Sequence, residues 1–306
     1  MSCFHPSFVQ RMVDKNGEVS HKFLGGIDNC LECNSVLREK YSGEKTLGFV
    51  ARTYQKGIIS DFILIPCGKC IGCRMDYSRS WADRMTYHVI GKEDVSWFVT
   101  LTYDDENVTD LQHSINYDLY ALEYDDMTKF IKRLRNKFRD CEIDYFYSGE
   151  YGDSTFRPHF HMILYGVDIP DLEFWKSNDS GDPIYISDIF NSLWQKGFVT
   201  ISKFSWRGAA YAASYVEKKL DGRRLDEYTA VGLTPEKARM SRRPGIAYDY
   251  YQEHSLDIWK NNGLSVPRDV NSSGKLGIPR YFRKLAEKDT TSPDYAAFLE
   301  WQNKML

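Results

Sequence analysis

Two histidines separated by one residue lie in an apolar, aromatic run, residues 158–165 (Pro-His-Phe-His-Met-Ile-Leu-Tyr). Side chains alternate between the two faces of a β-strand, so His159 and His161 should project from the same face. Two neighbouring imidazoles can bind a divalent metal ion, although two histidines on a sheet can also be packed and hydrogen-bonded without one. The surrounding residues must distinguish these interpretations.

A carboxylate is the usual companion of two histidines in a metal site, and Glu150 is the candidate. It ends an expected strand over 143–150, and a short turn containing Gly152 separates it from the histidines. If the two strands pair as a hairpin, Glu150 can reach the histidine face. Two nitrogens and one oxygen leave coordination positions open for water and a phosphate oxygen. Such a set suits Mg²⁺ or Mn²⁺, while Zn²⁺, Ni²⁺ or Cu²⁺ bind similar sites more tightly in vitro.

A second motif is a pair of tyrosines in the alanine-rich stretch 208–220. Tyr211 and Tyr215 are four residues apart, so on a helix both phenols share one face. Lys218 and Lys219 follow one turn later and are suited to holding a phosphate. A phenol with a pKa of about 10 is a poor nucleophile at neutral pH unless a metal polarises its target. Without a metal site, tyrosines on such a helix would be packing residues.

Six of the seven cysteines lie in the first quarter of the chain. Paired C-x-x-C spacing, as in Cys30 with Cys33 and Cys67 with Cys70, is typical of a four-thiolate zinc site. Cys3 and Cys73 compete for membership. We therefore expect a structural zinc site in this segment and leave its ligands open.

The elements that must position these motifs follow from periodicity. We expect, in chain order, a helix over 77–92, a strand over 96–103, a helix over 125–139, strands over 143–150 and 159–166, a helix from the N-cap Ser187 to Trp194, a strand over 198–204 and the tyrosine helix over 208–220. The order β-α-β-β-α-β predicts an α+β fold of the split βαβ (ferredoxin-like or RRM-like) type, with helices on one face of an antiparallel sheet.

Three segments are expected in the 306 residues. Residues 1–75 should form an irregular, cysteine-bearing segment packed on the core, 76–225 the core, and 226–306 an extension that wraps it. No stretch approaches a transmembrane span, and the first residues lack the apolar run of a signal peptide. These features predict a soluble protein that does not contact membranes.

The formal net charge of −3 gives no general reason to expect a nucleic-acid-binding protein. Local clusters differ. Basic residues gather at Lys129, Lys132, Arg133, Arg135, Lys137 and Arg139, and again at Arg223, Arg224, Lys237, Arg239, Arg242 and Arg243. The second cluster follows the tyrosine helix and is expected to contact DNA phosphates, whereas the first has the pattern of a solvated helix face.

Three of these elements recur in the HUH superfamily of rolling-circle replication initiators: the strand over 98–103, the His-x-His strand and the tyrosine helix with its lysines. Further motifs make the resemblance more specific: Cys-Phe-His-Pro at 3–6, Pro-Cys-Gly-Lys-Cys-Ile-Gly-Cys-Arg at 66–74 and Ser-Arg-Arg-Pro-Gly-Ile at 241–246. Together they resemble the replication initiators of gokushovirus-type phages in the microvirus family. The resemblance covers most of the chain.

The resemblance implies a role for each motif. His159, His161 and Glu150 would hold a divalent cation at the scissile phosphate. Tyr215 would attack, leaving a 5′-phosphotyrosine and a free 3′-OH. Tyr211 would act in the alternate round, when a unit-length strand is cut and rejoined into a circle. The 3′-OH would then prime synthesis.

The same resemblance implies the partners: single-stranded or origin DNA, a host DNA polymerase and, since the sequence has no GxxxxGK[ST] motif, a host helicase. The expected place of action is the host cell cytoplasm.

Two other interpretations remain open. The protein could be a non-catalytic, zinc-bearing DNA-binding module. Alternatively, two histidines and one carboxylate could form the iron site of an oxygenase, although that fold is normally a barrel and would leave the tyrosine helix without a function.

Overall fold

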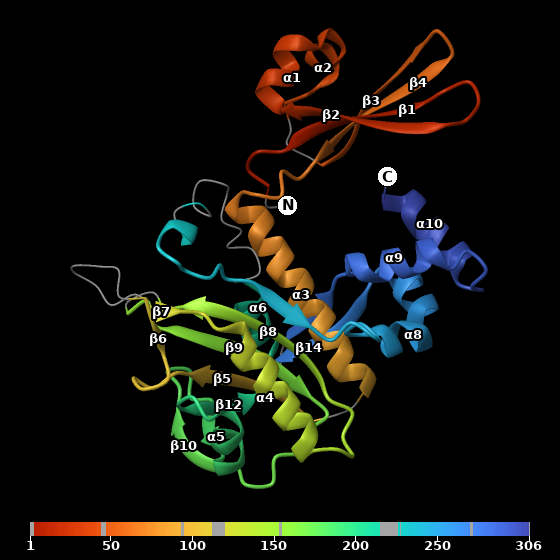
Figure 1. Ribbon diagram of the computed structural model, residues 1–306. Coiled ribbons are helices and arrows are strands. Elements are labelled where there is room, and N and C mark those ends of the chain that lie inside the picture. Colours follow the sequence, from red (N-terminus) through yellow and green to blue (C-terminus); the bar gives the residue numbers. More distant parts are fainter. Residues whose placement is uncertain are drawn as a thin grey trace. The chain divides into compact units, whose positions relative to one another are not determined.

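The computed structural model describes residues 3–43, 47–92, 95–111, 120–152, 155–214, 226, 228–269 and 272–305 (Figure 1). The chain divides into two compact units, Met1–Tyr77 with Leu299–Leu306, and Ser78–Phe298. Helices α3 (Ile71–Lys92) and α10 (Tyr295–Met305) contribute residues to both. Among the described residues, no helix is long and apolar enough to cross a membrane.

The first unit contains a four-stranded antiparallel sheet with two short helices (Figure 1). Its elements are β1 (Ser7–Val13), β2 (Val19–Gly26), α1 (Ile27–Cys33), α2 (Ser35–Lys40), β3 (Gly48–Gln55) and β4 (Ile58–Ile65), and the strand order is β2-β1-β4-β3. Phe8, Leu37, Phe62 and Leu64 form its buried core. The segment is therefore more regular than its sequence suggested. Strand β2 has no buried residue, so it lacks the alternation that would reveal a strand.

The second unit is built on a seven-stranded sheet, in which all neighbouring strands are antiparallel. The strands are β5 (Ser96–Thr102), β8 (Asp144–Tyr151), β9 (Pro158–Tyr165), β10 (Glu173–Ser177), β11 (Pro183–Ile186), β12 (Val199–Lys203) and β13 (Ala238–Met240). The central order is β12-β5-β9-β8, in which the fourth strand along the chain lies beside the first and the third between first and second. This confirms the split βαβ arrangement.

One face of this sheet carries the main hydrophobic core. Val99, Leu101, Phe160 and Met162 pack there with helix α4 (Tyr124–Lys137) and helix α5 (Asp188–Trp194). Ser187 caps α5 as expected, since its hydroxyl accepts the Phe190 amide at 3.1 Å.

The opposite face is also covered by helices, so the expectation of helices on one face alone is wrong. Helix α6 (Trp206–Ser214) contacts β8 and β9, and Ser148 Oγ donates to the Ala212 carbonyl at 2.9 Å. Helix α3 lies on the same face, where the rings of Trp81 and Phe146 are 5.2 Å apart. The phenylalanine and serine share the face of β8 that also carries Glu150, because their positions differ by two.

The remaining elements are two short strands, β6 (Thr109–Asp110) and β7 (Tyr120–Ala121), and a C-terminal part with α8 (Tyr248–Asn261), β14 (Leu264–Asp269), β15 (Ser272–Leu276) and α9 (Arg280–Lys288). Tyr87 on α3 packs against Tyr250 and Phe282, with ring centroids 5.1 and 5.2 Å apart. Helices α8 and α9 thus pack on α3, and residues 226–298 belong to the same unit as the sheet.

Candidate metal centre and tyrosine helix

The β8–β9 hairpin brings the acidic and imidazole side chains together. Its register places Glu150 directly opposite His159, and Ser148 opposite His161. Strand β5 flanks β9 on the other side and sets Thr100 opposite His161. Since directly opposed residues in an antiparallel ladder project from the same face, the carboxylate and both imidazoles meet on one face.

Three potential ligand atoms converge on this face. Glu150 Oε2 lies 3.1 Å from His159 Nε2 and 3.0 Å from His161 Nε2, and the two Nε2 atoms are 3.1 Å apart. The group is enclosed, because Glu150 is 2% and His161 6% exposed. Burial lowers the pKa of His161, although its hydrogen bond to Glu150 acts in the opposite direction.

The second nitrogen of each imidazole is held by the fold. His159 Nδ1 lies 3.1 Å from the Arg157 carbonyl, and His161 Nδ1 lies 3.1 Å from Thr100 Oγ1. A carbonyl only accepts hydrogen bonds, so His159 must donate from Nδ1. Such outer partners of metal-binding histidines fix the tautomer and direct the other nitrogen to the metal.

The donor set fits a divalent cation. With Nδ1 of His159 protonated, Nε2 of the neutral imidazole presents a lone pair towards a carboxylate oxygen 3.1 Å away. Two electron-rich atoms at that distance in a buried site repel each other unless a proton or a cation lies between them. Nitrogen and carboxylate ligands in this combination suit Mn²⁺ and Zn²⁺ and, less tightly, Mg²⁺.

Helix α6 brings the first tyrosine to the same site. Tyr211 Oη donates to Glu150 Oε2 at 3.5 Å, and its ring lies 5.0 Å from the His161 ring, measured between centroids. The side chain is 46% exposed, so it borders both the site and the solvent. Ser78 on α3 donates to the Ala210 carbonyl and, with Ser148, fixes this helix on the sheet.

Several expected functional residues lie outside the described part of the chain. These are Tyr215, Lys218, Lys219, Arg223 and Arg224. The helix expected over 208–220 is described from Trp206 to Ser214.

The first basic cluster has structural partners. Arg133 donates to the carbonyls of Leu193 and Trp194 on α5, and Lys129 pairs with Asp126 at 3.7 Å. Of the second cluster, Lys237 and Arg239 lie over the Tyr124 ring, at 4.6 and 5.3 Å from its centroid. These contacts use the lysine and arginine at β13 for packing as well as charge.

The cysteines separate clearly. Sγ atoms of Cys3, Cys67, Cys70 and Cys73 lie within 4.8 Å of one another. Cys30 is buried in the core of the first unit and Cys33 is exposed, and neither belongs to that group. The C-x-x-C pair at 30 and 33 was therefore a misleading signal.

Sequence reasoning missed two residues that support the histidines, Thr100 and Arg157. Thr100 could have been found, because alternation from any neighbour strand that pairs with β9 places a side chain against His161. The contribution of Arg157 is a backbone carbonyl, which no residue pattern announces.

Comparisons with known proteins agree with this site. A family model for the phage replication-associated protein ORF2 matches residues 96–220, which span β5 to the tyrosine helix. Replication-associated protein ORF2 of Spiroplasma virus 4 is 33% identical over 239 residues, covering 77% of this chain and 72% of the relative. Replication-associated protein VP4 of Bdellovibrio phage phiMH2K is 29% identical, with 90% and 84% coverage.

Replication-associated protein ORF4 of Chlamydia phage 1 is 28% identical and covers 84% of this chain and 65% of the relative. No solved structure matches the chain. The chain belongs to the replication-associated proteins of small phages of the gokushovirus type, the initiators of rolling-circle replication.

Proposed function

We propose that this replication initiator nicks single-stranded origin DNA by metal-dependent attack of a tyrosine and later rejoins the unit-length strand. One observation supports this most directly: Tyr211 Oη lies 3.5 Å from Glu150 Oε2, the oxygen that also contacts both histidines. A hydroxyl nucleophile and a divalent-cation site therefore occupy the same few ångströms.

The residues would divide the work as follows. His159, His161 and Glu150 would hold Mg²⁺ or Mn²⁺, and the bound cation would polarise the scissile phosphate and stabilise the charge that develops on it. The tyrosine gives up its proton and its Oη bonds to phosphorus. The bond from phosphorus to the 3′-oxygen breaks, and that oxygen takes a proton and leaves as a 3′-OH.

The product would be a 5′-phosphotyrosine and a free 3′-OH, which the host polymerase extends. In the reverse step a 3′-OH attacks the phosphotyrosine, and the tyrosine leaves as its hydroxyl. No net phosphodiester bond is lost, so rejoining needs no nucleotide cofactor. Two tyrosines allow one to cut while the other still holds DNA, with Tyr215 in the role that the family resemblance implies and Tyr211 in the alternate round.

Lys218 and Lys219 would hold the phosphate near the tyrosines. A host helicase would separate the strands, and the reaction would take place in the host cytoplasm.

The test is an adduct assay. The full-length protein is incubated with Mn²⁺ and labelled single-stranded oligonucleotides that tile the phage origin region, and the products are separated under denaturing conditions. We expect a protein–DNA adduct that is absent with EDTA, with His161→Ala and with the double variant Tyr211→Phe/Tyr215→Phe.

Tyr54→Phe is the matched control, because this tyrosine is 73% exposed on β3 of the other unit. It should form the adduct normally. If the wild-type protein binds both Mn²⁺ and DNA but forms no adduct, the proposal is overturned in favour of a non-catalytic DNA-binding module.

A further inference from the structure

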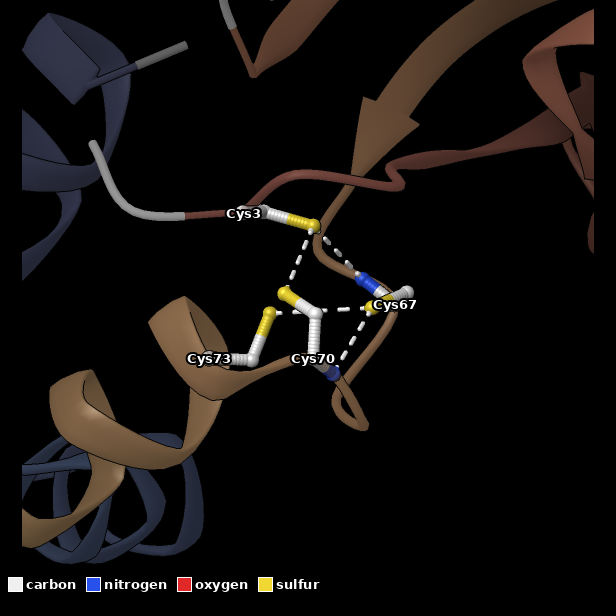
Figure 2. Close-up of side chains that lie close together, drawn as sticks. All are labelled: Cys3, Cys67, Cys70 and Cys73. Carbon is white, nitrogen blue, oxygen red and sulfur yellow. Dashed lines mark hydrogen bonds between the residues drawn. The ribbon is translucent and has the colours of Figure 1, made fainter.

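A second group of metal-ligating side chains lies in the first unit, away from the residues used above. The sulfurs of Cys3, Cys67, Cys70 and Cys73 point towards one another (Figure 2). All four are free cysteines. Cys67 and Cys73 Sγ are 3.9 Å apart, and so are Cys3 and Cys70 Sγ.

These separations match a tetrahedral four-thiolate site. With a Zn–S bond of about 2.3 Å, tetrahedral geometry puts the sulfurs roughly 3.8 Å apart. All ligand atoms of the cluster lie within 4.8 Å of one another. Four sulfurs converging without a histidine or carboxylate among them select zinc or iron over Mg²⁺ and Mn²⁺.

Backbone amides surround the sulfurs as they do around bound thiolates. Cys67 Sγ accepts from the amides of Lys69 and Cys70, each at 3.4 Å. The turn between the two cysteines requires Gly68, which has a φ of +72°. Amides that point at sulfur stabilise the negative charge of a thiolate.

The other two sulfur atoms that accept backbone amides join the ends of the segment. The Cys67 amide donates to Cys3 Sγ, and the Phe4 amide donates to Cys70 Sγ, each at 3.3 Å. Each half of the site therefore contributes an amide to the other half, which a chance meeting of four thiols would not produce.

The strand register explains how residues 64 positions apart meet. Strands β1 and β4 pair with Ser7 opposite Ile65, so the chain before β1 and the chain after β4 emerge at the same end of the sheet. Cys3 precedes β1 by four residues and Cys67 follows β4 by two. Cys73 lies in the first turn of α3, which completes the cluster.

We propose that Cys3, Cys67, Cys70 and Cys73 bind one structural Zn²⁺, which closes the base of the N-terminal sheet and fixes the start of helix α3. Each ligand binds as a thiolate, so the thiol protons are released to solvent when zinc enters. Cys30, Cys33 and Cys141 take no part. The ion has no open coordination position here, which separates its role from that of the histidine site.

The test measures zinc in the full-length protein with the histidine site removed by His159→Ala/His161→Ala. We expect one equivalent of zinc by elemental analysis, and X-ray absorption at the zinc edge should show four sulfur neighbours. Cobalt substituted for zinc should give the intense visible bands of a tetrahedral thiolate site. None of these readouts depends on DNA cleavage.

Variants then identify the ligands. In the same background, Cys3→Ser or Cys73→Ser should lower zinc content to well below one equivalent and expose residues 3–73 to limited proteolysis. Cys33→Ser and Cys141→Ser replace exposed thiols outside the cluster and should retain the metal. Should a variant fail to fold, the X-ray absorption spectrum of the parent still decides the question.

Three results would overturn the proposal: a zinc-free protein with seven thiols titratable after denaturation, a zinc edge dominated by nitrogen and oxygen neighbours, or loss of zinc in Cys30→Ser/Cys33→Ser with full retention in Cys3→Ser. Iron in place of zinc would likewise overturn it. Loss of DNA cleavage with normal zinc content would count against the proposed nickase and leave this site intact.

Discussion

Thr100 and His161 face each other across the β5–β9 ladder, with Thr100 Oγ1 3.1 Å from His161 Nδ1. The threonine touches the imidazole on the side opposite Glu150. It therefore holds the ring in the orientation that directs Nε2 towards the carboxylate, without contributing a ligand itself.

Replacing Thr100 with valine should weaken metal binding while preserving the fold. Valine has the same shape but no hydroxyl, so the His161 ring loses the partner that fixes it. Loss of such a partner typically lowers metal affinity about 10- to 100-fold. Mn²⁺ titration calorimetry measures the effect. Thr102→Val is the control, because its hydroxyl donates to the Phe198 carbonyl instead. Equal affinities for Thr100→Val and the wild-type protein would contradict the positioning role.

Replacing Glu150 with glutamine should abolish the stabilisation of the protein by Mn²⁺. At a concentration 100 times its dissociation constant, a ligand that binds only the native state stabilises it by about 2.7 kcal/mol. We expect the wild-type melting temperature to rise with Mn²⁺ and that of Glu150→Gln to stay unchanged. Glu236→Gln is a matched control, because Glu236 is also buried but accepts the Tyr151 amide instead. A full Mn²⁺ shift in Glu150→Gln would remove the carboxylate from the ligand set.

The histidine site was predictable because every step was local. Alternation set His159 and His161 on one face, and the short turn between strands placed Glu150 within reach of both. The structure shows this register, with Glu150 opposite His159. Propensity and capping also located helices α4 and α5 to within two residues, since their patterns extend over several turns.

The cysteine cluster was not predictable in the same way. Sequence spacing gave equal weight to Cys30 with Cys33 and to Cys67 with Cys70. Choosing between them requires knowing that Ser7 pairs with Ile65, a contact between distant segments that no local pattern encodes. The hairpin β10–β11 was missed for a related reason: all five residues of β10 are exposed, so hydrophobic alternation is absent.

Gly149 should be sensitive to the smallest possible substitution. A Cβ at this position would lie 2.7 Å from Tyr124 Oη and 3.0 Å from Phe160 Cε1. Overpacking of this kind costs about 1–3 kcal/mol of folding free energy. We expect Gly149→Ala to lower the free energy of unfolding in urea by that amount and to weaken Mn²⁺ binding, since Glu150 is the next residue. Gly26→Ala, where a Cβ meets nothing within 4 Å, should change neither.

Asp61 should make the stability of the N-terminal sheet depend on acidic pH. Hydrogen bonds from Arg52, at 2.5 and 3.1 Å, hold the pKa of this carboxyl below its usual range, outweighing the effect of burial, and Arg11 contributes a further bond at 3.2 Å. A depressed folded-state pKa means that the stabilisation is complete above the unfolded value, about 3.9, and is lost as pH falls through the folded value.

Asp61→Asn should therefore destabilise strands β1 and β4 at neutral pH and lose little further stability on acidification. We expect a cost of about 1 kcal/mol, because both arginines are partly exposed and solvent screens their charges. Hydrogen exchange of β1 and β4 amides, corrected for intrinsic rates and followed from about pH 7 to below about pH 4, measures it. Asp28→Asn removes an exposed carboxylate in α1 and serves as the control. If the gap between wild type and Asp61→Asn does not narrow at the acidic end of this range, the arginine pairing does not stabilise this sheet.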